Sequence, residues 1–355
     1  MPDSWTFAVT RDDLRRTTLV EGVTPTLVGG EALLRVDRVG LTANNVTYAV
    51  LGDSMRYWEF FPPAPRGLGP EWGLPPLWGF AEVVASTVAG VPVGQRVYGY
   101  LPPAGHLVVR PCRVDASGFR DASEHRADLP SPYNGYRSTT GDPAYRADQE
   151  DLLVLFRPLF FTSFMLADQV VDNDFYAATS LVVSSASSKT AYAAAYELHG
   201  RGARLVGLTS PGNLAFTRSL GCYDEVVSYA DIGALDVVPT AYLDLSGAPA
   251  TRAALRRHLG DRLVRDIAIG LTTQTPNADA ADEVFFAPVQ MRKRRLDWGR
   301  EGLDRRFTDA WRRFTGSVGG WLDVRIDVGP AALQRAWPEV LAGRTPPRVG
   351  QIIQY

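Results

Sequence analysis

Short apolar runs alternate with helix-like runs from residue 180 to residue 271. An apolar strand at Ser180–Val183 runs into a turn of small residues, and an alanine-rich helix is predicted at Thr190–Leu198. The pattern repeats with strands at Ala203–Leu208, 225–229, 241–244 and 263–271 and helices at Leu214–Leu220 and Thr251–Leu259. Strands that alternate with helices at this spacing predict a doubly wound parallel sheet in an α/β fold.

The first third of the chain follows a different pattern. Residues 29–48, 78–100 and 106–109 hold alternating or β-rich runs separated by Gly and Pro turns, which indicates a mainly β, barrel-like domain. Residues 111–150 are polar and predict a long loop, and residues 151–170 predict a helix rich in Leu and Phe. The alternating strands after residue 320 predict a return to the first domain. The expected domains are therefore 1–150, completed by 291–355, and 151–290.

Composition restricts the partners and the compartment. The formal net charge of -2 over 355 residues gives no field that would attract nucleic acid or an anionic membrane. The start of the chain does not resemble a secretory signal, and no apolar stretch approaches the roughly 20 residues needed to span a bilayer. Two cysteines fit a reducing compartment. We therefore expect a cytoplasmic protein with a small-molecule ligand, and a local salt-bridge cluster or solvated face at Arg292–Arg295.

The turn between the first strand and the first helix of the α/β part is the strongest candidate site. A dinucleotide fold needs small residues there, because backbone N–H groups and the positive end of the helix dipole approach the pyrophosphate. The usual G-x-G-x-x-G pattern is absent, and the predicted cofactor-binding residues of the turn are Ser184, Ser185, Ala186, Ser187, Ser188, Lys189 and Thr190. A plain Ser-rich turn that opens a helix is the alternative. A P-loop is disfavoured because both of its glycines are missing.

The end of the second strand predicts which dinucleotide binds. An NAD-preferring site usually has an acidic residue there, which binds the ribose 2′-hydroxyl. This chain has the neutral Thr209, Ser210 and Asn213 instead, so an added 2′-phosphate meets no repulsion. We therefore expect NADP (NADPH) as the cofactor, unless these residues only cap the next helix.

Other catalytic chemistries find little support in the sequence. None of the four histidines pairs with a cysteine or another histidine at ligand spacing, so no metal site is predicted. No Gly-x-Ser-x-Gly elbow of a hydrolase occurs. Aromatic residues crowd 57–61 and 133–136, close to the polar run 44–48. Core packing is the ordinary role of such clusters, but a tyrosine hydroxyl in a pocket can donate a proton to an oxyanion.

Several segments together resemble the medium-chain dehydrogenase/reductase superfamily. GEALLRVDRVGLTANNVTY is similar to the opening of its GroES-like domain, and PVGQRVYGY is similar to a later turn and strand of that domain. SLVVSSASSKTAYAAAYEL stands where the zinc-independent quinone-oxidoreductase branch has its glycine-rich turn. LTANNVTY, YNGY, RPLFFTSF, SSASSKT and FFAP resemble more narrowly a branch known only as a domain of unknown function. The resemblance implies a GroES-like β-rich domain and a Rossmann dinucleotide-binding domain.

The resemblance also implies roles for individual residues. Thr42 stands in place of the catalytic zinc cysteine, Asn45 in place of an acid that follows it, and Tyr48 near an active-site tyrosine. Ser185, Ser188 and Ala191 take the glycine positions of the turn. The remaining cofactor positions are Asn213 in place of a phosphate-binding lysine, Tyr229 near the adenosine ribose, and Thr162 near the nicotinamide.

The expected function is a zinc-independent, NADP-dependent reductase of a small activated carbonyl, enone or quinone. Without zinc, the oxyanion that develops on the substrate must be stabilised by hydrogen-bond donors, and the candidates are Asn45, Tyr48 and Tyr133. A non-redox lyase or retro-aldol-type enzyme and a dinucleotide sensor or partner-binding protein remain alternatives. The resemblance further implies a homodimer, with FFAPVQ as a possible apolar contact.

Overall fold

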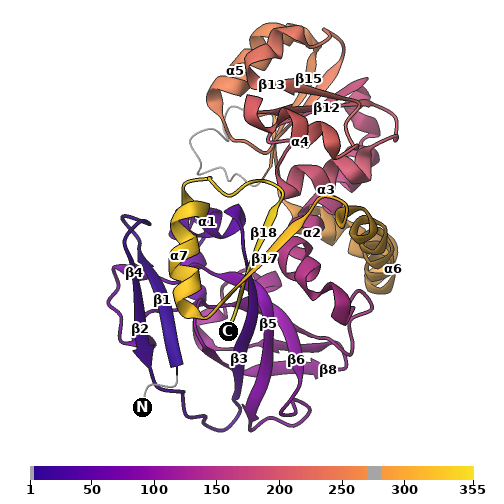
Figure 1. Ribbon diagram of the computed structural model, residues 1–355. Coiled ribbons are helices and arrows are strands. Elements are labelled where there is room, and N and C mark those ends of the chain that lie inside the picture. The colour runs from indigo at the N-terminus through magenta and orange to yellow at the C-terminus, as the bar shows by residue number, and fades with distance from the viewer. Residues whose placement is uncertain (1–3, 270–280) are drawn as a thin grey trace. The chain divides into compact units, whose positions relative to one another are not determined.

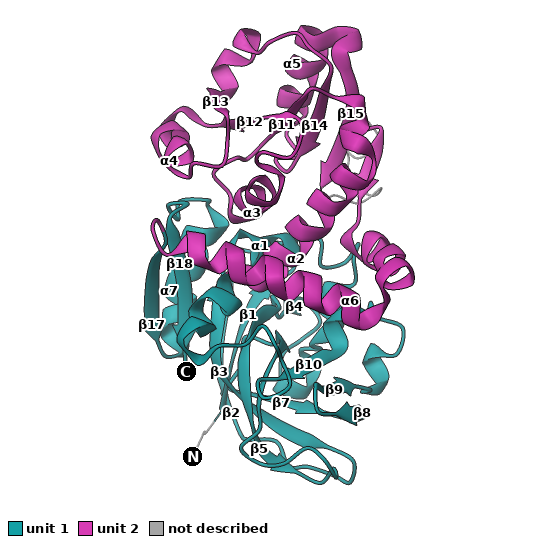
Figure 2. Cartoon of the chain, turned by 90° about the vertical axis from the view of Figure 1, so that its right-hand side faces the viewer, with its two compact units in different colours: residues 1–155, 322–355 teal, residues 156–321 magenta. Residues whose placement is uncertain are grey.

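The computed structural model describes residues 4–269 and 281–355, which form two compact units. Unit 1 comprises residues 1–155 and 322–355, and unit 2 comprises residues 156–321 (Figure 2). The units do not end where the sequence placed the domain boundaries, because helix α6 (Ala287–Val318) belongs to unit 2. The end of the predicted strand 263–271 lies outside the described residues.

Unit 1 is rich in antiparallel strands. One sheet has the order β2-β1-β4, and a larger sheet has the order β17-β18-β3-β5-β6-β10-β9-β8, with β7 paired to β3. The strands of unit 1 are β1 (Ser4–Thr10), β2 (Thr17–Gly22), β3 (Ala32–Leu41), β4 (Trp72–Gly73), β5 (Leu77–Ser86), β6 (Arg96–Leu101), β7 (His106–Val109), β8 (Pro111–Asp115), β9 (Gly118–Asp121), β10 (Gly135–Ser138), β17 (Asp323–Val328) and β18 (Val349–Gln354). Its helices are α1 (Ala43–Val50) and α7 (Pro330–Leu341). The predicted return of the tail to the first domain is confirmed, because β18 pairs with β3.

The prediction of a long loop at 111–150 is wrong. Strands β8, β9 and β10 extend the larger sheet there, and two short 3₁₀ turns lie between β9 and β10. These strands have only four or five residues each, and their polar residues and turn-forming neighbours concealed the alternation. Asp121, for example, is buried at the end of β9, and its carboxylate accepts hydrogen bonds from the backbone of Arg110 and Ser123.

Unit 2 contains a six-stranded parallel sheet of the order β13-β12-β11-β14-β15-β16. Its strands are β11 (Ser180–Val183), β12 (Arg204–Thr209), β13 (Glu225–Ser228), β14 (Thr240–Asp244), β15 (Leu263–Ile269) and β16 (Glu283–Phe285). Helices α3 (Lys189–Leu198), α4 (Leu214–Ser219) and α5 (Pro249–Leu259) connect these strands (Figure 1). Numbered along the chain, this is the 3-2-1-4-5-6 order of a Rossmann sheet, so the predicted fold is confirmed. Ligands of such sheets bind outside the strands' carboxyl ends where the order reverses, here between β11 and β14.

Helix α2 (Glu150–Asp172) is confirmed where the sequence predicted a helix rich in Leu and Phe. Among the described residues, 147–172 is the segment long and apolar enough to cross a membrane, but 61% of its most apolar window is buried, as in the core helix of a globular protein. The basic run at the start of α6 forms the predicted salt-bridge cluster. Arg294 pairs with Asp168 at 2.6 Å and with Asp172 at 2.8 Å, and Lys293 also pairs with Asp172.

Candidate functional site

The serine-rich turn lies at the carboxyl end of β11, where the strand order of unit 2 reverses. Ser184–Ser188 connect β11 to α3, and Ser185 has a left-handed backbone conformation, with φ of 51°. That conformation usually favours glycine, so Ser185 keeps the geometry of a glycine position at some cost in strain. Gly207 on β12 makes room for the turn, since a Cβ there would lie 2.9 Å from the Cβ of Ala186.

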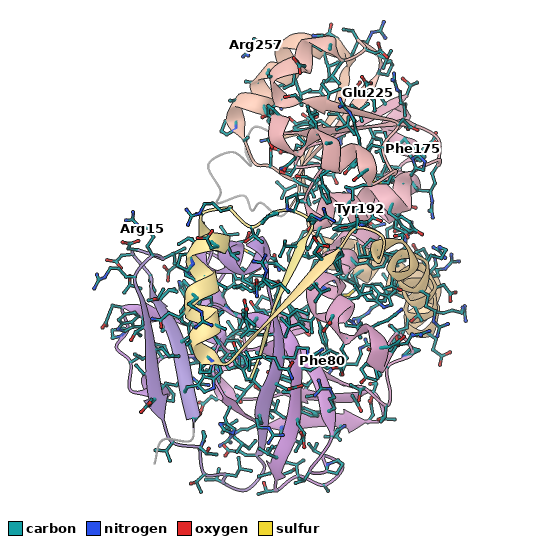
Figure 3. The ribbon with its side chains drawn as sticks, viewed as in Figure 1. Arg15, Phe80, Phe175, Tyr192, Glu225 and Arg257 are labelled. Atoms are coloured by element: carbon teal, nitrogen blue, oxygen red, sulfur yellow. The ribbon has the colours of Figure 1, made fainter. Side chains whose placement is uncertain are left out.

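Helix α3 begins at the turn and is firmly anchored in unit 2. The hydroxyl of Ser188 accepts a hydrogen bond from the N–H of Ala191 at 3.2 Å and therefore caps the helix. Tyr192 on α3 (Figure 3) is buried, and its hydroxyl lies 2.9 Å from that of Ser317 on α6. The carbonyl of Thr190 accepts from Ser163 of α2 at 2.8 Å. The amide of Tyr192 donates to the carbonyl of Ser188 at 2.9 Å, so Ser188 satisfies two of the first amides of α3.

Side chains from the ends of neighbouring strands converge on the turn. Asn213, after β12, donates to the hydroxyl of Ser187 at 3.2 Å. The hydroxyl of Tyr229, after β13, accepts from the backbone N–H of Ser185 at 2.7 Å. Thr209 is buried at the end of β12, and Ser210 follows it. The structure therefore brings most of the predicted cofactor residues to one edge of the sheet. Thr162 lies on α2, where its hydroxyl donates to the carbonyl of Pro158 at 3.3 Å.

Lys189 is the first residue of α3, and its side chain is half-buried rather than extended into solvent. Burial disfavours the charged ammonium and lowers the pKa of Lys189 to about 8. The positive end of the helix dipole acts in the same direction. A bound anion would reverse both effects, because opposite charge favours the protonated form.

Asp244 is a site residue that the sequence analysis missed. It ends β14 beside the turn and is fully buried. Its Oδ1 atom accepts from the hydroxyls of Ser184 and Tyr242, each at 2.9 Å, and from the backbone and hydroxyl of Ser246. Its Oδ2 atom lies 2.8 Å from a guanidinium nitrogen of Arg252. A strand that ends in Asp-Leu-Ser-Gly was the available signal, because an acid at a strand's carboxyl end faces the ligand edge of such a sheet.

The residues of this edge fit the phosphates of a dinucleotide. The turn offers serine hydroxyls, one lysine and the positive end of the α3 dipole, all of which favour a bound phosphate. Four of the five turn amides are occupied within the protein. Ser185 donates to the Tyr229 hydroxyl, while Ser184, Ala186 and Ser188 donate to the carbonyls of Leu243, Leu208 and Ser185. Phosphate would therefore meet mainly the hydroxyls of Ser187 and Ser188 and the side chain of Lys189.

In unit 1, Tyr48 and Tyr133 lie in one aromatic cluster. The ring centroids of Tyr48 and Tyr133 are 6.3 Å apart, and Tyr57 lies 4.7 Å from Tyr48 and 5.7 Å from Tyr133. The hydroxyls of Tyr57 and Tyr133 are 3.2 Å apart, and the hydroxyl of Tyr48 accepts from Trp78 at 3.0 Å. We call Tyr48, Tyr57, Trp78, Tyr100 and Tyr133 the tyrosine cluster.

The tyrosine cluster keeps its hydroxyl groups protonated. Burial raises the pKa of Tyr48, Tyr100 and Tyr133 well above the ordinary value near 10, and neighbouring tyrosines raise each further. The hydroxyl of Tyr100 is fully buried and has no hydrogen-bond partner among the described residues. The aromatic alternation of β5 and β6 was the signal that could have added Trp78 and Tyr100 to the candidates.

Asn45 is engaged in a structural contact. Its Oδ1 atom accepts from the backbone N–H of Thr42 at 2.7 Å, which completes a capping box at the start of α1. Its Nδ2 atom donates to the carbonyl of Pro76 at 2.8 Å. Asn45 is 2% exposed and thus holds α1 against the segment before β5. Within the described residues, no group of three His, Cys, Asp or Glu side chains could hold a metal ion.

Several solved structures share this fold over nearly their whole length. CurA of Vibrio vulnificus in complex with NADPH is 13% identical, with a TM-score of 0.60 over 99% of this chain and 98% of that one. A mycobacterial protein complexed with NADPH is 13% identical, with a TM-score of 0.57 over 99% and 100%. The quinone oxidoreductase of Coxiella burnetii is 12% identical, with a TM-score of 0.54 over 99% of both chains. These likenesses show that the chain has the same fold as these structures.

No curated protein matches the sequence. A family model does match it, over residues 39–346, which is most of the chain. That family is described as a protein of unknown function, and the matched region includes the tyrosine cluster, the serine-rich turn and Asp244. The chain belongs to this family, DUF2855.

Proposed function

We propose that the protein is an NADP-dependent reductase of a small activated carbonyl, enone or quinone, which works without zinc. The observation that carries this proposal is the position of the serine-rich turn, with Lys189 and the start of α3, at the point where the Rossmann strand order reverses. The absence of an acid among Thr209, Ser210 and Asn213 favours NADPH over NADH. Solved structures of the same fold were obtained with NADPH, which supports the choice.

In this proposal, unit 2 binds the dinucleotide and unit 1 binds the substrate. The hydroxyls of Ser187 and Ser188, at the positive end of the α3 dipole, receive the pyrophosphate, and Lys189 adds a charge. Asn213 and Tyr229 flank the adenosine end, and Thr162 remains the candidate nearest the nicotinamide. The cofactor supplies a hydride when it is bound. Asp244 positions Ser184 and Ser246 through its hydrogen bonds and has no contact with the reacting atoms.

The tyrosine cluster is proposed to stabilise the oxyanion that develops on the substrate oxygen. A hydroxyl whose pKa is raised stays protonated at neutral pH, so it is ready to donate a hydrogen bond. Tyr133 is the leading donor, because its side chain is only half-buried and its hydroxyl is paired with that of Tyr57. The hydroxyl of Tyr48 already accepts a hydrogen bond from Trp78, so the proton of that hydroxyl points away from Trp78. Asn45 is proposed to be a positioning residue: its hydrogen bonds hold helix α1, and α1 carries Tyr48.

The protein is proposed to be cytoplasmic and to act on a small molecule, since its net charge of -2 does not attract nucleic acid or anionic membranes. The test is NADPH oxidation, followed by absorbance, with a panel of quinones, enones and activated ketones. Stoichiometric oxidation with one class supports the proposal. Turnover without any dinucleotide would instead show the non-redox enzyme, and binding without turnover would show the sensor.

A further inference from the structure

Strand β17 is an edge strand of the larger sheet in unit 1 and leaves apolar side chains exposed. It pairs in parallel with β18, and no other strand of the described residues pairs with it (Figure 2). Val324 is 39% exposed, Ile326 is 42% exposed and Val328 is 73% exposed. An exposed apolar edge is a template for pairing with another chain, and proteins usually protect it.

The backbone of β17 has its free hydrogen-bonding groups at the apolar residues. The N–H groups of Asp323 and Gly329 donate to carbonyls of the β18 side, at Arg348 and Gln354. Alternate residues of a strand direct their N–H and C=O groups to opposite sides, so the odd-numbered residues of β17 face β18. The even-numbered residues, Val324, Ile326 and Val328, therefore direct their N–H and C=O groups outward.

The charges of β17 select a second copy of this chain as the occupant of the edge. In an antiparallel pair centred on Ile326, Arg325 lies opposite Asp327 of the partner subunit, and symmetry repeats the pair. Val324 then lies opposite Val328 of the partner subunit, and Ile326 opposite its own copy. Centring on Arg325 instead would place Arg325 opposite itself and Asp323 opposite Asp327 of the partner subunit. Like charges directly opposite are destabilising, whereas opposite charges stabilise a strand pair.

We propose that the outer edge of β17 pairs with the same edge of a second copy, in the antiparallel register centred on Ile326. The charged residues that ordinarily prevent edge pairing are complementary in this register, and the outward N–H and C=O groups of Val324, Ile326 and Val328 form the hydrogen bonds. The interface is isologous, so each contact occurs twice, as in most homodimers.

The proposal is tested by charge exchange on the full chain, with mass measured by light scattering across a dilution series. The wild type should have twice the chain mass at micromolar concentration. Arg325→Asp and Asp327→Arg should each raise the dissociation constant at least about tenfold, since two attractive pairs become repulsive. The double variant Arg325→Asp/Asp327→Arg should restore the dimer. Arg325 is exposed, whereas Asp327 is partly buried and its carboxylate accepts a hydrogen bond from Gln351 at 2.9 Å. Circular dichroism therefore checks that each variant is folded.

Asp323→Arg is the matched control, because in this register Asp323 lies opposite Gly329 of the partner subunit and its reversal should leave the mass unchanged. A wild-type monomer would overturn the proposal. So would a dimer that survives both single reversals, which would place the interface elsewhere, for example at the exposed Phe286 and Val289 of the FFAPVQ segment. A failure of the double variant to restore the dimer would also overturn the register.

Discussion

Lys189 combines two properties that are unfavourable for the protein without ligand: a half-buried ammonium and a position at the positive end of α3. Its lowered pKa means that the folded chain holds fewer protons than the unfolded chain between about pH 8 and the ordinary value of 10.5. The resulting cost to stability is fully present below pH 8 and is relieved as the pH rises through 10.5. A bound phosphate would convert this cost into an attraction.

We predict that Lys189→Ala weakens NADPH binding by about 1–3 kcal/mol, the scale of one charge-assisted hydrogen bond. The free protein should be no less stable at pH 7, because the burial cost is removed. Binding of NADPH to the wild type should also weaken above about pH 8, as Lys189 loses its proton. Calorimetric titration measures the affinities, and Lys189→Arg is the control that keeps the charge. An unchanged affinity in Lys189→Ala would show that Lys189 does not bind the phosphates.

For the tyrosine cluster we predict that Tyr133→Phe lowers kcat by about 100-fold, with a small effect on KM, because the lost hydrogen bond strengthens only as the oxyanion develops. The wild-type kcat should be independent of pH from 6 to 9, since the raised pKa keeps Tyr133 protonated. Steady-state kinetics measure both. Tyr145→Phe, which removes a hydroxyl outside the cluster that donates to Glu150, is the control. Equal activities of the two variants would show that the Tyr133 hydroxyl takes no part in the reaction.

At the scale of single elements, helix α1 depends on Asn45 for its first turn. We predict that Asn45→Ala lowers the free energy of unfolding by about 1–3 kcal/mol, because the N–H of Thr42 and the carbonyl of Pro76 lose their partner. Urea unfolding measures this change. Thr47→Ala, on the exposed side of the same helix, should have a much smaller effect. Normal stability together with a large loss of kcat would instead show that Asn45 acts directly on the substrate.

Strand β14 ends in a buried ionic network. Arg252 bridges Asp244 and Asp266, at 2.8 Å and 3.1 Å, and all three side chains are buried. We predict that Asp244→Asn costs about 3–5 kcal/mol of stability, because the buried Arg252 loses one of its two carboxylate partners. Asp236→Asn, which breaks the exposed pair with Arg204, should cost less than about 1 kcal/mol. Similar urea midpoints for the two variants would contradict this account of the network.

At the scale of the whole molecule, the sequence predicted the fold well where apolar runs were bounded by clear turn residues. The strands at Ser180–Val183 and His106–Val109 have the predicted bounds, and α3 begins one residue before the predicted Thr190. The short strands of 111–150 were missed because their polar residues and turn-forming neighbours concealed the alternation. Helix α6 was missed because its polar, arginine-rich sequence hides the buried positions Trp311 and Phe314.

The candidate site was predicted in part, for a physical reason. The turn residues are contiguous, so a local pattern revealed Ser184–Lys189. Asp244 and Tyr100 reach their sites through long-range packing of strands, which no local spacing records. The same limit explains why the structural contact of Asn45 was not predicted, because its partner Pro76 lies 31 residues away in the sequence. Sequence reasoning therefore located the serine-rich turn, Tyr48 and Tyr133, while the structure supplied the network around them.

The central claim is that the serine-rich turn of unit 2 binds the phosphates of NADPH. Isothermal titration of the full chain with NADPH, and separately with NADH, tests it most directly. We predict saturable binding of one NADPH per chain, tighter than NADH by at least about tenfold, since hydrogen-bond donors without a carboxylate favour the 2′-phosphate. No binding of either dinucleotide, or binding of NADH as tight as that of NADPH, would contradict the account.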